Sequence, residues 1–203
     1  MIENVLTNDA IQANANEFES LIRKINRDGA KIDKLLYKLE NSDWYTAPAS
    51  TEYHGAYPGG LVDHSLCVYH NLLSLIKTKQ LTNISEESII ITALLHDLDK
   101  MNCYEQYVRN VPPSKEHPSW TKEESYRKIK NRDFRYGNHE QNSEYMVRQF
   151  IPLTIEESVA ILHHMGGMAF DSSQVNIGQI YDKYPLAMFL HLADMLSAYI
   201  DKA

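Results

Sequence analysis

Cysteine is scarce in this sequence: Cys67 and Cys103 are the only two among 203 residues. Two thiols can form neither a disulfide framework nor the thiolate cluster of a structural zinc site. Any metal that the chain binds must therefore be held by imidazole and carboxylate groups.

Long apolar runs and internal repeats are also missing. No stretch approaches the roughly 18 uninterrupted apolar residues of a membrane span, and the first residues lack the basic and apolar regions of a signal peptide. No period of about 20 to 50 residues indicates a repeat architecture. We expect a cytoplasmic protein with no membrane segment and a single domain over residues 1–203, of which 1–50 form N-terminal helices.

Positive charge is in deficit, since the formal net charge is −7. This argues against a general nucleic-acid-binding surface. However, nine of the 20 Lys and Arg residues fall between Lys100 and Arg135, against five acidic residues there, which leaves +4 in this segment and −11 in the rest. The segment either holds an anionic substrate or is a solvated loop, and the sequence favours both interpretations equally.

Apolar residues recur at helical spacing along most of the chain, which predicts a mostly α fold. Asn8, Ser85 and Thr154 are expected N-caps, and Pro185 is expected in a first turn. The predicted helices cover residues 9–27, 32–39, 61–77, 85–97, 140–150, 154–165 and 185–200. Residues 44–60 are expected to form an ordered loop, and the proline-rich and aromatic segment at about 104–136 an irregular flap or a short hairpin.

The pair His96-Asp97 ends the apolar run 89–95, whose composition predicts a central helix. His64 and Asp194 also lie within apolar helical segments, where an unpaired imidazole or carboxylate would cost several kcal/mol of desolvation. Coordination to a cation removes that cost. Asp97 is the candidate bridge between two cations about 4 Å apart, the spacing that suits phosphoryl displacement.

These residues resemble the pattern of the HD-domain metal-dependent phosphohydrolases: a His, then His-Asp, then a distant Asp. The matching segments are 54–65 (HGAYPGGLVDHS), 94–100 (LLHDLDK), 164–167 (HMGG) and 190–194 (LHLAD). The resemblance covers about residues 53–201 and implies an all-α, HD-domain-like helical bundle with a metal-binding core in that range. It implies that the first metal is held by His64, His96, Asp97 and Asp194, and a second by His139 and His164.

Several neighbours of these ligands have more than one interpretation. His163 and His164 point about 100° apart on a helix, so we assign His164 as the ligand and His163 to an outer position or a substrate contact. His191 shares a helical face with Asp194 and is expected to orient it or to touch substrate. His54 is interpreted as structural. Lys100 either neutralises charge that develops on a phosphoryl oxygen or is a lysine that the helix dipole favours at the end of its helix.

Two further positions depart from the pattern of many members of the family. Asp99 and Glu140 stand where those members have Gly, and both are expected close to the substrate phosphate. The departures put in doubt any substrate carried over from a particular subfamily.

The resemblance implies a metal-dependent phosphohydrolase that cleaves a phosphoester or phosphoanhydride bond of a small-molecule phosphate, expected to be a nucleotide, with metal-activated water. Asp97 and Lys100 are the expected catalytic residues. Imidazole-rich ligation favours one or two Mn, Fe, Co, Ni or Zn ions. The alternatives are a di-iron oxygenase on the same fold and a non-catalytic nucleotide-sensing HD module. The oligomeric state stays open.

Overall fold

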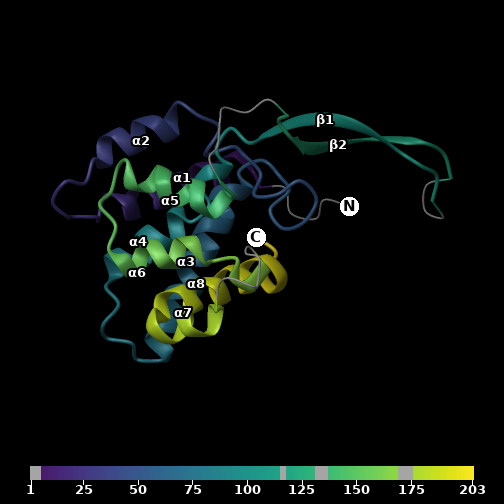
Figure 1. The fold of residues 1–203 in the computed structure, drawn as a ribbon. Coiled ribbons are helices and arrows are strands. Elements are labelled where there is room, and N and C mark those ends of the chain that lie inside the picture. The colour runs from purple at the N-terminus through teal and green to yellow at the C-terminus, as the bar shows by residue number, and fades with distance from the viewer. Residues whose placement is uncertain (1–5, 115–117, 131–136, 169–175) are drawn as a thin grey trace.

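The computed structural model describes residues 6–114, 118–130, 137–168 and 176–203. The elements in chain order are α1 (Asn8–Ile22), α2 (Ile32–Glu40), α3 (Gly60–Thr78), α4 (Glu86–Leu95), η1 (Leu98–Lys100), β1 (Tyr104–Val111), β2 (Thr121–Lys128), α5 (His139–Arg148), α6 (Ile155–Leu162), η2 (Gly166–Met168), α7 (Ile177–Lys183), α8 (Pro185–Leu196) and η3 (Ser197–Asp201). Figure 1 shows this mostly helical architecture, which confirms the expected fold class at that level. None of the helices in the described part of the chain combines the length and the hydropathy needed to cross a membrane.

The ends of the helices follow local capping chemistry, with two corrections. Ser85 and Thr154 cap α4 and α6 as expected, each accepting a hydrogen bond from a backbone N–H three residues later. At α1, however, the cap is Thr7 and not Asn8, and this helix ends at Ile22 and not near residue 27. Helix α7 was not expected, because its seven residues contain no buried side chain and so leave no strong apolar period.

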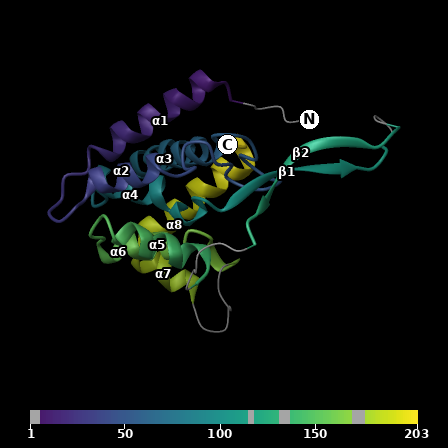
Figure 2. The ribbon, with the colours of Figure 1, turned by 90° about the horizontal axis from the view of Figure 1, so that it is seen from above.

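Helix α4 lies in the core, as its composition predicts: every residue from Ile89 to Leu95 is buried. Helix α3 packs against α4 and α8, and α6 packs against α5 and α8. Figure 2 shows α1 along one side of this arrangement and α5, α6 and α7 along the other. This packing therefore holds α3, α4, α6 and α8 in fixed relative positions.

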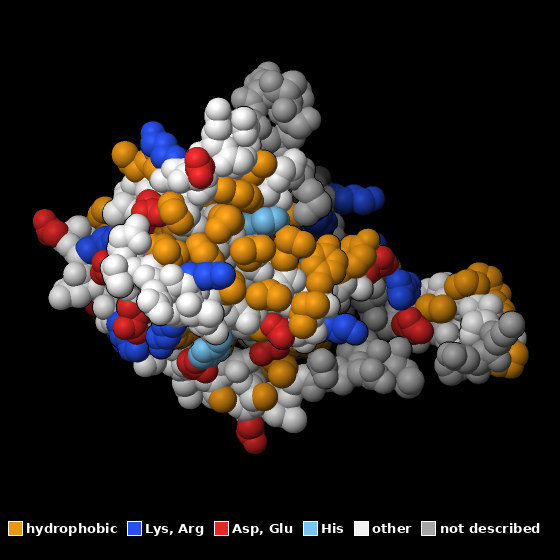
Figure 3. All heavy atoms as spheres, turned by 90° about the horizontal axis from the view of Figure 1, so that it is seen from below, with side chains coloured by type: hydrophobic (Ala, Val, Ile, Leu, Met, Phe, Trp, Pro, Cys, Tyr) orange, Lys and Arg blue, Asp and Glu red, His pale blue; other side chains and the backbone are white. Residues whose placement is uncertain are grey.

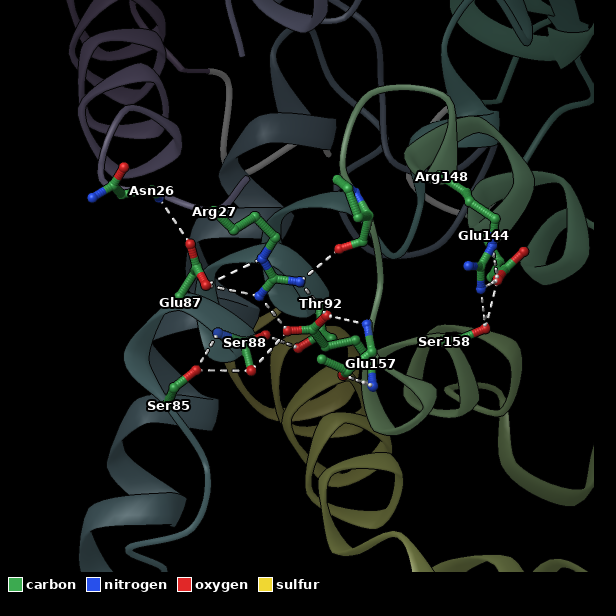
Figure 4. A network of polar contacts seen from close by, with 12 residues as sticks. Asn26, Arg27, Ser85, Glu87, Ser88, Thr92, Glu144, Arg148, Glu157 and Ser158 are labelled. Carbon is green, nitrogen blue, oxygen red and sulfur yellow. Dashed lines mark hydrogen bonds and ion pairs between the residues drawn. The ribbon is translucent and has the colours of Figure 1, made fainter. Parts of the chain in front are cut away.

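Arg27 fixes the N-terminal ends of α4 and α6 relative to each other (Figure 4). Its guanidinium donates to Glu87 Oε2 in the first turn of α4, at 2.8 Å, and to both carboxylate oxygens of Glu157 in the first turn of α6, at 2.7 and 2.8 Å. Ser88 also donates to Glu157, at 2.8 Å. Because the Glu157 side chain is fully buried, this charge-assisted network is the main compensation for its desolvation.

Strands β1 and β2 form an antiparallel hairpin that pairs Tyr104 with Lys128 and Val111 with Thr121. The hairpin projects from the helical body (Figure 1). Arg109 and Arg127 form ion pairs with Glu123 and Glu105 across the strands. Two of the four basic side chains in the strands are thus paired within the hairpin, which favours the solvated interpretation for these two residues. Lys115, Arg132 and Arg135 lie outside the described residues.

Candidate metal centre

His64 and Asp194 come from α3 and α8, which pack together. His64 is fully buried, and its Nδ1 lies 3.1 Å from Ser197 Oγ. Its Nε2 lies 3.1 Å from Asp194 Oδ1. The start of α3 is set by a close backbone approach, because a Cβ on Gly60 would lie 2.1 Å from Gly55 O. Glycine at this position therefore lets the preceding loop pack on the first turn of the helix that carries His64.

His96 and His164 occupy equivalent places after α4 and α6. Each ring Nδ1 lies 2.8 Å from the carbonyl oxygen three residues earlier, which belongs to Ala93 and Ile161 respectively. A carbonyl can only accept, so Nδ1 carries the hydrogen and Nε2 is left to bind a cation. Arg27 holds the opposite ends of the same two helices, and this arrangement brings the two imidazoles to within 4.9 Å of each other between ring centres.

His139 is the first residue of α5, where a capping box between Asn138 and Gln141 fixes the start of the helix. Its Nε2 lies 3.2 Å from His164 Nε2. Its other nitrogen, Nδ1, lies 3.4 Å from Glu140 Oε2, and Glu140 is buried. A carboxylate behind a histidine can orient the ring. Glu140 thus faces the back of His139 and does not line the substrate side.

Asp97 lies between two groups of histidines, and its two oxygens face different groups. Oδ2 is 3.3 Å from His96 Nε2 and 3.9 Å from His64 Nε2. Oδ1 is 3.6 Å from His139 Nε2 and 3.7 Å from His164 Nε2. The structure thus brings together all six side chains expected as ligands, with one oxygen of Asp97 facing each group of histidines.

The arrangement fits a cation on chemical grounds. Among the described residues, the buried atoms His64 Nε2, His96 Nε2 and Asp97 Oδ1 make no hydrogen bond, although carboxylate oxygens lie 3.1 and 3.3 Å from the two ring nitrogens. Such groups are costly to bury unless something coordinates them. Ligand atoms about 2.0–2.2 Å from one ion lie roughly 3 Å apart at tetrahedral or octahedral angles. Two triads have ligand atoms within 4.8 Å of one another and could hold an ion, namely His64, His96 and Asp194, and His96, Asp97 and His164.

The electrostatics of the cluster agree with this fit. Burial alone would raise the pKa of Asp97, but Lys100 and His96 outweigh it and hold that pKa well below its usual range. Burial would lower the pKa of His96, yet the Asp97 carboxylate raises it, so the field beside this ring favours positive charge. Burial lowers the pKa of His164 to about 3. Near neutral pH, Asp97 is ionised and His164 is neutral, the states in which both ligate metals.

A cavity of about 130 Å³ opens beside the cluster. One part of its wall is polar and includes Lys100, whose Nζ lies 2.7 Å from Asp97 Oδ2. Another part is formed by Met165, Met195, Ala198 and Tyr199. The cavity therefore combines a charged interior with an apolar side.

His54 is the residue that the sequence interpretation missed. It lines the cavity, and its ring centre lies 4.7 Å from that of His64. Burial, followed by the charges of His64 and Lys100, lowers the pKa of His54 to about 4, so its ring is neutral near pH 7. Its place ten residues before His64, in the same loop-to-helix segment, was the available signal.

The other expected neighbours divide into two kinds. His191 lines the cavity, and its Nδ1 donates to the backbone oxygen of His164 at 2.6 Å. It thus supports the backbone of His164 while lining the cavity. His163, by contrast, is not among the residues that line this cavity, and neither is Asp99, whose backbone N–H donates to Ser143 Oγ. The expectation that Asp99 and Glu140 lie next to a substrate phosphate finds no support in this lining.

Comparison with protein-family models, with curated proteins and with solved structures finds no match to this chain. The resemblance to the HD-domain family thus rests on the sequence motifs, and the interpretation of the site rests on its geometry.

Proposed function

We propose that this protein is a metal-dependent phosphohydrolase of the HD-domain type. The observation that carries the proposal is the position of Asp97, one of whose oxygens faces His64 and His96 while the other faces His139 and His164. A buried carboxylate shared between two groups of imidazoles is the arrangement expected of a bridging ligand in a two-metal site.

Each residue then has a definite role. His64, His96, Asp97 and Asp194 hold one divalent transition-metal ion, and His139 and His164, with Asp97, hold a second. When bound, such ions polarise a phosphoryl oxygen and lower the pKa of water to near neutrality. Two outer groups keep the ligands in place: Ser197 contacts the back of His64, and Glu140 contacts the back of His139.

The cavity indicates a small anionic group as the reacting part of the substrate. Its volume of about 130 Å³ is close to the roughly 150 Å³ of a cavity that binds one benzene molecule, enough for a phosphoryl group but not for a whole nucleotide. The Lys100 ammonium supplies positive charge at the oxygens of that group. The neutral ring of His54 offers a further hydrogen-bonding partner. The organic part of the substrate, expected to be a nucleoside, then lies toward Met195 and Tyr199.

Elemental analysis of the purified protein, followed by a nucleotide-hydrolysis screen, tests this proposal. Chelated protein should release phosphate only when Mn²⁺, Co²⁺ or Ni²⁺ is added back. The variant Asp97→Asn should lower kcat/KM by more than about 100-fold. The loss of a residue that only supports a metal ligand already costs about 10–100-fold, and Asp97 is proposed as a ligand itself. His70→Gln is the matched control, because His70 is exposed and pairs with Glu17 at the surface.

The same samples separate the proposal from its alternatives. About two metals per chain with phosphate release support the binuclear site, whereas one metal restricts it to His64, His96, Asp97 and Asp194. Dioxygen uptake by iron-loaded protein without phosphate release would replace the proposal with oxidative chemistry. No metal and no turnover would favour a sensing module.

A further inference from the structure

A row of large apolar side chains is exposed along α8 and the π-helical turn η3 that follows it. The row consists of Leu192, Met195, Leu196, Tyr199 and Ile200, and the last two are 69% and 70% exposed. Figure 3 shows hydrophobic side chains gathered across this face of the molecule. We call these five residues the α8 stripe.

The opposite side of α8 is apolar as well. Leu186, Ala187, Phe189, Leu190 and Ala193 are buried against the helical body. Apart from His191 and Asp194, which face the cavity, α8 is therefore apolar, and a large exposed apolar patch on a soluble protein normally marks an interaction site. In the part of the chain that the structure describes, no element covers the α8 stripe.

The charge around the stripe restricts what can cover it. Between Pro185 and Asp201 the sequence contains no Lys or Arg, and its acidic residues are Asp194 and Asp201. Helices that lie on membranes carry Lys and Arg along their polar face, so a lipid surface is a poor partner. A surface without charges of its own suits a partner that is equally apolar.

A second copy of the chain has this property by symmetry. Leu192 and Leu196 are spaced four residues apart and lie on one ridge of α8, and Ile200 follows in the π-helical turn η3. Ridges of four-residue spacing interlock in the commonest mode of helix packing. In an antiparallel pair centred on Leu196, Leu192 of one copy lies opposite Ile200 of the other. A specific interface needs roughly 600 Å² from each partner, and five exposed large side chains supply most of this area.

We propose that the α8 stripe is the interface of a twofold symmetric homodimer, in which α8 of one copy packs antiparallel on α8 of the other. The interface adjoins the cavity, because Met195 and Tyr199 belong to both. The second copy therefore covers one side of the cavity mouth. This proposal depends on the exposed face and not on the reaction that the cavity supports.

Sedimentation velocity or light scattering over a dilution series tests the dimer, using the variant Ile200→Asp. The substitution places a charge in each half of the interface and removes both Ile contacts, so the dissociation constant should rise roughly a hundredfold or more. Ile155→Asp is the matched control, because Ile155 is 71% exposed at the start of α6, away from the stripe. It should dimerise like the unchanged protein.

A disulfide test checks the symmetry. The variant Leu196→Cys, made together with Cys67→Ser, should form a covalent dimer on mild oxidation, because the two copies of residue 196 meet at the twofold axis. The variant Ile155→Cys in the same background should not. A monomer at all concentrations would overturn the proposal, and so would a dimer that Ile200→Asp leaves intact. A dimer that Ile200→Asp disrupts but that Leu196→Cys does not cross-link would overturn the antiparallel arrangement.

Discussion

Metal binding should stabilise the fold by an amount that can be worked out beforehand. Within the described part of the chain, the buried atoms His64 Nε2, His96 Nε2 and Asp97 Oδ1 make no hydrogen bond, and each such group costs about 1–3 kcal/mol. A ligand at 100 times its dissociation constant stabilises the folded state by about 2.7 kcal/mol. In a chain of this size, 1 kcal/mol shifts Tm by about 2–4 °C. Saturating chelated protein with Mn²⁺, Co²⁺ or Ni²⁺ should therefore raise Tm by roughly 5–11 °C.

The variant Asp97→Asn shows whether the shift comes from this site. Asparagine keeps the shape of the side chain, but it loses the negative charge and presents one oxygen where the carboxylate presents two, so it cannot bridge. Differential scanning fluorimetry with and without metal should show less than half of the shift. The exposed His70→Gln variant should keep all of it. An equal shift in unchanged protein and in Asp97→Asn, or no shift in either, would refute the assignment of these ligands.

Four further predictions follow from the contacts described above. Arg27→Met should lower the free energy of unfolding by about 3–5 kcal/mol in urea titrations, since it leaves the buried Glu157 carboxylate without its charged partner. Burial would raise the pKa of Glu157, but Arg27 outweighs it and lowers that pKa, so its stabilisation is present above about pH 5 and is lost as the pH falls through the folded value. The urea midpoint of Glu157→Gln should therefore change less between pH 7 and pH 3 than that of the unchanged protein. Gly166→Ala should cost about 1–3 kcal/mol in the same assay, because Gly166 has φ +63° and a Cβ would lie 2.8 Å from the His191 ring. His54→Ala should lower kcat/KM roughly tenfold, the value of one hydrogen bond, with unchanged metal content.

Each of these predictions has an opposing result. Arg27→Met with unchanged stability would mean that Glu157 is compensated by its other partners. An identical acid dependence in Glu157→Gln would assign the loss of stability at low pH to other carboxylates. Gly166→Ala with full stability would show that the loop before η2 can relax. Loss of metal together with activity in His54→Ala would make this residue a support of His64 and not a substrate contact.

The helices were largely predictable because their signals are local. Apolar periodicity placed α2, α3 and α4 within one or two residues of their observed ends, and the Ser85 and Thr154 caps lie where the sequence puts them. The end of α1 was not predictable, because Arg27 lies outside the helix and donates to Glu87 and Glu157, which are 60 and 130 residues away in the chain. Helix α7 was not predicted, because it buries no side chain and so shows no clear apolar period.

The sequence by itself determined which residue types can ligate a metal and that they lie at or near the ends of apolar helices, because residue type and apolar spacing are properties of the chain alone. The tertiary structure decided which of these groups meet. It brings His164 to the cavity and leaves His163 out of its lining, and it adds His54 to the wall. It also divides the two oxygens of Asp97 between two groups of histidines. The physical reason is that side-chain directions after a helix end depend on backbone angles and on packing between distant segments, which no local spacing specifies.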